Sequence, residues 1–502
     1  MELDLPRTYH WVFLLVIIVS SAVIFRKKER LPDVEFLRIS AKPGKAGNAD
    51  DVYFIAAPKF LEELRKAPET HISQVDAANI IFQLKYTFHP ALEQDLYHFD
   101  VVRKSLTQNL PRIIPDLEDE TKRAFALDLG KPSEWTEAQV YSLASKVVTR
   151  VSNRMMVGPD LCRNDEFLFY SGAFTKATFD SAAMLRNMPS LLKPLMMYFM
   201  TDHMKQQQIA RKCLVPIIKE RLSIMENRHD AKDMPNDALQ WLLEISPADK
   251  RDPEILLQRM LHINVTAIHA PAVTLTECIF DLCRHPDIHE ELRTEIAEVF
   301  GSKPQGSVWT KANVENLIKL DSFIRESARL TPMSAGKYYH THYMLYIRSL
   351  LIIDFLPVKM ERLAIQDYRL SDGTLIPRGT SIGIISHGRQ IDDDIFPNAA
   401  KFDAFRFAKM RAQPEMASQY TFAQASSENL LFGLGRHACP GRHFASVLLK
   451  LLLVHILVNY DIKFVDGKPM PQGKWTQKFR NPDFTASIAW REREIEERFA
   501  SL

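Results

Sequence analysis

The sequence predicts a mainly helical protein with small β-sheets and one transmembrane helix at its N-terminus. Helical periodicity recurs along most of the 502 residues, strand-like runs are short and lie mostly at 361–384, and residues 9–25 carry no formal charge. Charged residues make up 25% and hydrophobic residues 46%, which excludes a largely disordered chain. We therefore expect one large helical body attached to a membrane.

The apolar run 9–25 is the predicted membrane anchor. At 1.5 Å per residue it spans about 26 Å, which suits the thin membrane of the endoplasmic reticulum. Arg26, Lys27 and Lys28 follow it, so the positive-inside rule places the later chain in the cytoplasm and residues 1–8 in the lumen. A secretory signal peptide is the alternative, but its basic residues would precede the apolar run. We expect a single-pass protein of the endoplasmic reticulum membrane.

The segment 26–50 is linker-like in composition, and residues 51–502 contain no internal repeat. We expect these residues to form one domain. Its helices are predicted where apolar residues recur three and four positions apart. These segments are 58–66, 98–110, 118–127, 136–157, 205–227, 254–284, 287–299, 311–330 and 441–459.

Turn residues divide the strand-like region into a hairpin. Asp372 and Gly373 predict one turn, and Pro377 and Gly379 predict a second. Because these strands are short, we expect small peripheral sheets and no central parallel sheet.

Charge and cysteine content exclude two further classes of protein. Lys and Arg total 64 against 62 Asp and Glu, a net charge of +2, and no stretch concentrates the basic residues as nucleic-acid binding would require. The five cysteines are odd in number and scattered, which indicates a reducing compartment and no disulfide framework.

One cysteine lies in an unusual setting. Residues 432–445 read FGLGRHACPGRHFA, and an apolar helical run follows. Gly433, Gly435 and Gly441 allow backbone conformations that other residues resist, and a helix N-terminus favours a thiolate. A structural buried cysteine would need neither the glycines nor the basic residues. Cys439 is therefore predicted to bind a metal or to react.

This loop resembles the haem-binding loop of the cytochrome P450 monooxygenases in Phe432, Gly435, His437, Cys439 and Gly441. The resemblance implies the cytochrome P450 fold and a haem whose iron is held by the Cys439 thiolate, which favours cleavage of the O–O bond. It also implies that His437 reaches a haem propionate and that Phe432 packs beside the sulfur.

A distant pattern supports the resemblance. Glu326 and Arg329 lie three residues apart on one predicted helix face, and Arg406 follows about eighty residues later. In the resembling family these three form a buried charge network on the cysteine side of the haem. We interpret the trio as structural, because removing one member strands the others.

The residues Leu106-Thr107-Gln108, the run Val151-Ser152-Asn153-Arg154 and the predicted hairpin resemble fungal members of the family that oxidise terpenoids and related secondary metabolites. This weaker likeness covers most of 51–490. It implies that Arg103 and Arg362 bind haem propionates, by charge complementarity. Solvated surface arginines are the alternative in both cases.

The predicted distal helix 254–284 departs from the family pattern. Relatives place an acid or His and then Thr where this chain has His269 and Ala270. A methyl group cannot relay a proton, so water, Thr266 or Thr274 substitutes, or oxygen activation is impaired. His269 is either a proton donor or a satisfied helix residue. Pro271 removes an N–H and is expected to kink the helix.

The segment 336–358 is a suspected insertion, because relatives have a much shorter connection there. Its Tyr, His, Ile, Met and Leu content matches translated AT-rich nucleotides, and Gly336-Lys337 can be encoded by a splice-donor sequence. We hypothesise a retained intron. The alternative is a genuine apolar insertion that adds membrane or substrate contacts.

The sequence therefore predicts a haem-dependent monooxygenase that uses O2 to oxidise an apolar small molecule, which we expect to be a terpenoid. No flavin or nicotinamide fingerprint is visible, so electrons are expected from NADPH through a separate NADPH–cytochrome P450 reductase. Two alternatives stay open. One is a P450-type isomerase that does not activate oxygen, and the other is a catalytically impaired haem-binding protein.

Overall fold

A computed structural model describes most of the chain. The described residues are 53–56, 58–186, 188–227, 234–301, 308–331, 358–385, 387–476 and 479–499. The predicted anchor 9–25 and the linker 26–50 lie outside them, as does the suspected insertion 336–358 except for its last residue.

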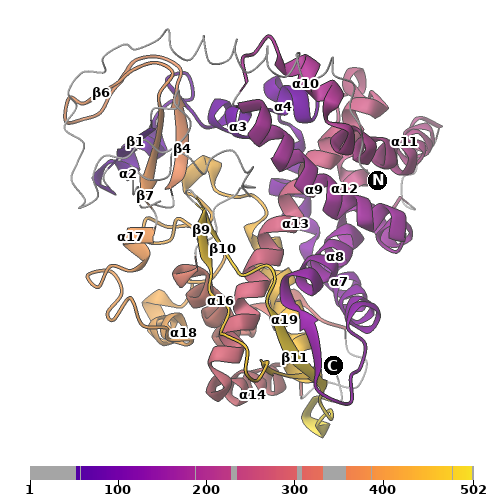
Figure 1. Ribbon diagram of the computed structural model, residues 1–502, viewed down its shortest axis with the longest axis vertical. Coiled ribbons are helices and arrows are strands. Elements are labelled where there is room, and N and C mark those ends of the chain that lie inside the picture. The colour runs from indigo at the N-terminus through magenta and orange to yellow at the C-terminus, as the bar shows by residue number, and fades with distance from the viewer. Residues whose placement is uncertain are drawn as a thin grey trace, which may run out of the picture.

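Helices dominate the described residues, as expected (Figure 1). Those before residue 250 are α2 (Leu61–Lys66), α3 (Gln74–Phe82), α4 (Leu84–Thr87), α5 (Ala91–Gln94), α6 (His98–Asp100), the π-helix η2 (Val101–Leu106), α7 (Thr107–Asp128), α8 (Val140–Cys162), α9 (Asp165–Arg186), α10 (Lys193–Phe199), α11 (Thr201–Asn227) and α12 (Ala238–Ile245). Those after it are α13 (Pro253–Arg284), α14 (His289–Phe300), α15 (Lys311–Asn316), α16 (Ile318–Leu330), α17 (His387–Gln390), α18 (Arg406–Arg411) and α19 (Arg442–Asn459). Short 3₁₀ turns are η1 (Pro58–Phe60), η3 (Ala248–Lys250), η4 (Pro286–Ile288), η6 (Pro414–Met416), η7 (Gly435–His437) and η8 (Glu497–Phe499).

Within the described residues, four short sheets accompany the helices. The largest has the order β1-β7-β4-β2 and lies at one side of the helical body (Figure 1, upper left). The others have the orders β3-β11-β8, β10-β9 and β5-β6. The strands are β1 (Tyr53–Ala56), β2 (Ile72–Ser73), β3 (Thr136–Gln139), β4 (Val358–Ala364), β5 (Tyr368–Arg369), β6 (Leu375–Ile376), β7 (Ser381–Ile385), β8 (Tyr460–Phe464), β9 (Lys474–Thr476), β10 (Phe479–Asn481) and β11 (Ser487–Glu492).

The predicted hairpin is confirmed as β5 and β6. Gly373 and Gly379 have φ of +90° and +85°, values that favour glycine, and the N–H of Thr380 donates to the carbonyl of Pro377 over 3.2 Å. Both predicted turns therefore form.

Three predicted helix boundaries were wrong. Residues 136–139 form β3, which pairs antiparallel with β11, so α8 begins only at Val140. The expected break between 110 and 118 is absent, because α7 continues through Pro111 and Pro115 and buries an apolar face there. The segment 311–330 divides at Leu317 into α15 and α16.

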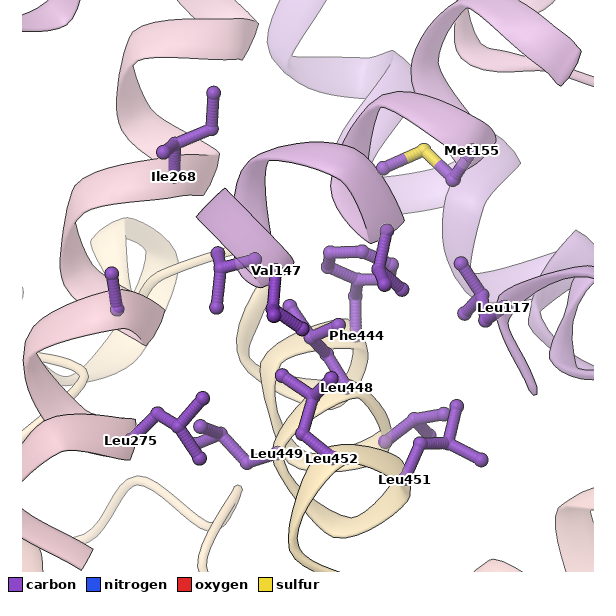
Figure 2. Close-up of a cluster of buried hydrophobic side chains, with 14 of the residues drawn as sticks. Leu117, Val147, Met155, Ile268, Leu275, Phe444, Leu448, Leu449, Leu451 and Leu452 are labelled. Carbon is purple, nitrogen blue, oxygen red and sulfur yellow. The ribbon is translucent and has the colours of Figure 1, made fainter. Parts of the chain in front are cut away.

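The core centres on α13 and α19. Asp252 caps α13 by accepting from the N–H groups of Glu254 and Ile255, and Pro253 occupies the first turn, where its missing N–H costs nothing. Figure 2 shows apolar side chains of α7, α8, α13 and α19 packed together, and Leu448 and Leu452 of α19 are both fully buried. Each such leucine stabilises the fold by about 2 kcal/mol.

Within the described residues, two helices are long and apolar enough to cross a membrane. They are Pro253–Arg284 and Arg442–Asn459, and 72% of the most apolar window of each is buried inside the protein. Both are therefore core helices by their packing, and their apolar character reflects the core that they build.

Candidate active site

The cysteine loop folds back on itself. The N–H of Cys439 donates to the carbonyl of Phe432 over 2.7 Å, and the Phe432 ring packs edge-on against Phe422 at 5.2 Å. Gly433 and Gly435 both have φ of +71°. The loop is thus closed by a hydrogen bond between its two ends, and the left-handed positions that closure requires are filled by glycine.

Gly435 is needed for space as well as for its backbone conformation. A β-carbon at this position would lie 2.8 Å from Cγ of Arg65, which comes from α2. The neighbouring Arg436 donates to the carbonyl of Ala67, just after α2. The loop is therefore pressed against the N-terminal helix α2.

Cys439 lies at the end of the loop, just before the start of α19. Gly441 is the residue before the first turn, and the side chain of Arg442 donates to the carbonyl of Cys439 over 2.9 Å. Val102 of η2 lies on the other side, because a β-carbon at Gly441 would be 3.6 Å from its Cγ1. Helix η2, which carries Arg103, thus lies beside the cysteine loop.

Cys439 is exposed at the surface of the loop, although many protein atoms surround its thiol. The residue is exposed and forms no disulfide, yet burial raises the pKa of its thiol. Backbone hydrogen bonds from Gly441 and Arg442 lower that pKa, so the expected thiolate-stabilising effect of the helix start is present but is outweighed by burial. A bound metal ion deprotonates a coordinating thiol directly. The donor set therefore suits a thiolate ligand.

His437 and Arg362 form a basic cluster near Cys439. Nε2 of His437 lies 2.5 Å from Oε1 of Glu69, and Nη2 of Arg436 lies 3.5 Å from the same oxygen. Burial lowers the pKa of the Arg362 guanidinium to about 10, although the charge of Glu69 raises it. The charge of Arg362 in turn lowers the pKa of His437. Both predicted propionate residues on this side are thus brought together.

Arg362 is only 3% exposed, and one of its guanidinium N–H groups donates to the carbonyl of Glu361 over 2.8 Å. In the part of the chain that the structure describes, no carboxylate lies within ion-pair distance of it. A buried cation needs a counter-charge. The propionate of a haem is a carboxylate that fits this requirement.

Arg103, the third predicted propionate residue, is not buried as Arg362 is. Its side chain is 55% exposed and pairs with Asp100 at 3.3 Å on its own helical segment. Its backbone lies beside the cysteine loop through Val102, as described above. The predicted contact of Arg103 with a propionate stays a prediction.

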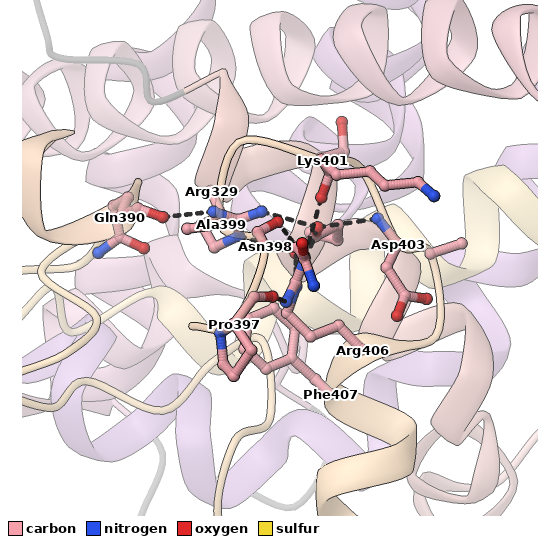
Figure 3. Close-up of polar contacts among 12 residues, drawn as sticks. Arg329, Gln390, Pro397, Asn398, Ala399, Lys401, Asp403, Arg406 and Phe407 are labelled. Atoms are coloured by element: carbon pink, nitrogen blue, oxygen red, sulfur yellow. Dashed lines mark hydrogen bonds and ion pairs between the residues drawn. The ribbon is translucent and has the colours of Figure 1, made fainter. Parts of the chain in front are cut away.

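The predicted charge trio forms as expected, and two of its members, Arg329 and Arg406, are labelled in Figure 3. Arg329 makes two hydrogen bonds of 2.8 Å to the carboxylate of Glu326, and Nε of Arg406 lies 3.2 Å from the same group. Glu326 is fully buried, and Arg406 also donates to backbone carbonyls of Pro397, Asn398 and Lys401. The trio therefore joins α16 to the segment that leads into α18.

On α13, the predicted distal residues lie within one helix. Nδ1 of His269 is 3.2 Å from the hydroxyl of Tyr141 in α8. Thr266 is exposed and donates to the carbonyl of Ile263, and Thr274 donates to the carbonyl of Ala270 over 3.1 Å. The helix is not interrupted at Pro271. These contacts place the side chains, and their catalytic roles stay predictions.

Sequence reasoning missed a buried polar chain on the same helix. Arg259 donates to Nδ1 of His98 over 3.0 Å, and Nε2 of His98 lies 3.0 Å from Nδ1 of His262. All three residues are at most 4% exposed. No local pattern reveals this contact, because His98 and His262 are 164 residues apart.

Comparison with known proteins agrees with this geometry. The sequence model of the cytochrome P450 family matches residues 108–342 and 349–486. The chain belongs to the cytochrome P450 family. The unmatched residues between these two parts fall inside the suspected insertion 336–358.

Similar proteins are fungal cytochromes P450. The chain is 30% identical over 466 residues to cytochrome P450 monooxygenase AN1598 of Emericella nidulans, covering 91% of this chain and 82% of the relative. It is 32% identical to cytochrome P450 monooxygenase 151 of Postia placenta, covering 88% and 84%. It is 28% identical to ent-kaurene oxidase P450-4 of Gibberella fujikuroi, covering 88% and 83%.

A solved structure shows the same fold. Retinoic acid bound cyanobacterial CYP120A1 superposes with a TM-score of 0.62 at 15% identity, covering 88% of this chain and 89% of the other. The family model and the fungal relatives, together with this fold, make the chain a cytochrome P450 monooxygenase with a haem-thiolate cofactor. The assignments of Cys439 to the iron and of Arg362 and His437 to the propionates stay predictions.

Proposed function

We propose that this cytochrome P450 oxidises an apolar secondary metabolite of terpenoid type, with electrons from NADPH through a separate reductase. The observation that carries the haem chemistry is the exposed Cys439 at the start of α19, in the loop whose His437 lies near the buried Arg362. The terpenoid class is supported by the relative named as an ent-kaurene oxidase.

Bound haem supplies the activation of oxygen, and the protein supplies the surroundings. Arg362 and His437 would hold the carboxylates of the cofactor through charge-assisted hydrogen bonds. On α13, the contact with Tyr141 fixes the ring of His269, and Thr274 holds its hydroxyl on the carbonyl of Ala270. We assign proton delivery to this part of α13, with Thr266 and Thr274 in place of the missing threonine at 270.

The test begins with the purified full-length chain and a fungal NADPH–cytochrome P450 reductase. The reduced protein should bind carbon monoxide with the absorption of a thiolate-ligated haem, and a panel of terpenoids should contain at least one that is oxidised at the expense of NADPH. Ala270→Thr should raise the fraction of NADPH that appears as product. A correct carbon monoxide spectrum without any terpenoid product would contradict the proposed substrate class.

A second candidate is supported by Ala270, which lacks the hydroxyl that relatives place there. Under this alternative the enzyme rearranges its substrate without activating oxygen. The two are separated by omitting NADPH and O2 from the reaction. Product that still forms would favour the isomerase, and product that needs both would favour the monooxygenase.

We further propose that the protein is a single-pass protein of the endoplasmic reticulum membrane, anchored by residues 9–25 with its catalytic domain in the cytoplasm. The apolar surface near α10 supports contact with lipid, because α10 buries none of its residues. Leu191 is 89% exposed and Tyr198 is 72% exposed. Such a contiguous exposed apolar stretch favours an interface.

This membrane proposal is tested by fractionation and by vesicle binding. A chain lacking residues 1–30 should still bind vesicles, and Leu191→Glu with Phe199→Glu should weaken that binding severalfold. Met470→Glu is the matched control, since Met470 is also an exposed apolar residue, at 62%. Equal binding by both variants would contradict the role of α10.

A further inference from the structure

A cavity of about 360 Å³ lies away from the cysteine loop. Residues of α7, of the C-terminal half of α19 and of the segment after β11 form its walls. Its volume is in the range of small-molecule sites, which are mostly apolar with a few polar groups. The apolar lining residues used below are Ala126, Trp309, Leu451, Val454 and Phe499.

The cavity is distinct from the haem site. His455 lines it, thirteen residues along α19 from Arg442, where the helix starts beside Cys439. At 1.5 Å per residue this is about 20 Å along the helix axis. A molecule in the cavity would therefore contact the opposite end of the helix that begins at the cysteine loop.

Trp309 lies in the cavity wall and carries an unpaired hydrogen-bond donor. The residue is 5% exposed and its ring packs against Phe300 with centroids 4.2 Å apart. Its Nε1–H is buried and has no hydrogen-bond partner among the residues that the structure describes. Leaving such a group unpaired is unfavourable, so an acceptor in the cavity that reached it after a small turn of the Trp309 ring would be stabilised there.

His455 supplies a second donor in a fixed orientation. Its ring stacks on Phe125 with centroids 4.7 Å apart, and the amide nitrogen of Asn459 lies 3.4 Å from Nδ1. Because an amide NH₂ only donates, Nδ1 accepts, and the neutral ring carries its proton on Nε2. Burial lowers the pKa of His455 to about 4, which keeps the ring neutral at pH 7.

The charged groups at the cavity are already paired. Nζ of Lys122 lies 2.7 Å from Glu118, and Nζ of Lys131 lies 3.0 Å from Glu492. Two lysines and two glutamates balance, so the site offers no net charge to an ionic ligand. The donors that remain are neutral N–H groups in an apolar wall.

From these contacts we infer a second small-molecule site in this cytochrome P450, which binds a neutral, mainly apolar molecule that carries a carbonyl or another acceptor oxygen. The acceptor pairs with Trp309 Nε1–H or His455 Nε2–H, and the apolar part packs on Leu451, Val454 and Phe499. Occupancy ties the segment after β11 to α7 and α19.

The experiment titrates the haem-loaded full chain with 4-fluoroacetophenone, a neutral aryl ketone, and follows binding by ¹⁹F NMR. Saturating econazole, an azole that ligates haem iron, blocks the substrate site throughout. Ala126→Trp fills the cavity from an exposed position, and Leu127→Trp places the same ring on the adjacent residue, which is 58% exposed and does not line the cavity.

Saturable binding should persist with econazole, disappear in Ala126→Trp and remain in Leu127→Trp. Trp309→Phe keeps an aromatic ring but removes the donor, so its affinity should fall about fivefold to tenfold. Trp309→Phe also keeps the test valid if Ala126→Trp does not fold. Binding that econazole abolishes, that Ala126→Trp leaves unchanged, or that is absent in the parent chain would overturn the inference.

Discussion

Nε2 of His98 lies 3.0 Å from Nδ1 of His262, and this contact joins α6 to the core helix α13. Arg259 donates to the other nitrogen of His98, so that nitrogen must accept, and the proton of His98 sits on Nε2. His98 then donates to His262. Both rings are neutral, because burial lowers the pKa of His98 to about 2 and that of His262 to about 4.

This histidine pair should make the protein sensitive to acid. Both folded-state pKa values lie below the value of about 6.5 in the unfolded chain, so the unfolded state binds protons first as the pH falls. Stability is therefore present above pH 6.5 and is lost progressively from there toward pH 4. His262→Asn keeps an acceptor for His98 but does not titrate.

We expect His262→Asn to lower the free energy of unfolding by about 1 kcal/mol at pH 7.5. At pH 5 the deficit should vanish or reverse, a relative change on the order of 2 kcal/mol. Urea unfolding at the two pH values measures this. A deficit that is the same at both would show that the buried pair does not titrate with folding.

Glu326 should be among the residues least tolerant of substitution. Glu326→Gln keeps the size of the side chain but leaves Arg329 and Arg406 buried with less counter-charge, which should cost about 3–5 kcal/mol of unfolding free energy. The matched control is Lys409→Ala, which removes the exposed ion pair of Lys409 with Asp403. That change should cost less than about 1 kcal/mol. Similar losses in both variants would argue against a buried network.

Gly435→Ala should distort the cysteine loop. At position 435 the φ is +71° and an added β-carbon would lie 2.8 Å from Cγ of Arg65. At Gly373 the φ is +90°, but no atom lies close to the position of an added β-carbon. Gly373→Ala should therefore lower stability by about 1 kcal/mol without loss of haem. Gly435→Ala should also reduce haem content, and adding Arg65→Ala should restore part of it. The ratio of Soret to protein absorbance measures haem content, and no recovery in the double variant would contradict the steric explanation.

Cys439→Ser should remove the thiolate without disturbing the fold. The helix content by circular dichroism should stay unchanged, while the carbon monoxide spectrum of a thiolate-ligated haem and NADPH-dependent turnover should both be lost. Cys283→Ser is the control, since Cys283 is only partly exposed and lies at the end of α13. A thiolate-type spectrum in Cys439→Ser would exclude Cys439 as the ligand.

The sequence allowed prediction of the features that depend on local chemistry. The helices 254–284 and 441–459 were placed within one residue of α13 and α19, because their apolar periodicity and end signals agree. The loop around Cys439 and the trio of Glu326, Arg329 and Arg406 were also recognisable. Each is encoded by residues of unusual type at fixed spacing.

Features that depend on tertiary packing could not be predicted. Separate helices were expected at 98–110 and 118–127, but the burial of Ile113, Ile114 and Leu117 in the core keeps α7 continuous through Pro111 and Pro115. The short strand β3 is held by β11, about 350 residues later, and gives no periodic signal of its own. The contact between His98 and His262 was invisible for the same reason.

The position of Arg362 relates the supply of haem to the resistance of the protein to degradation. This arginine belongs to β4, whose partners β7 and β2 hold the small sheet together. A ligand that binds only the native state shifts the folding equilibrium toward it, and a haem propionate bound by Arg362, as proposed above, would also neutralise an interior positive charge. A cell short of iron or porphyrin should therefore degrade this enzyme faster, so its abundance would follow haem synthesis as well as transcription.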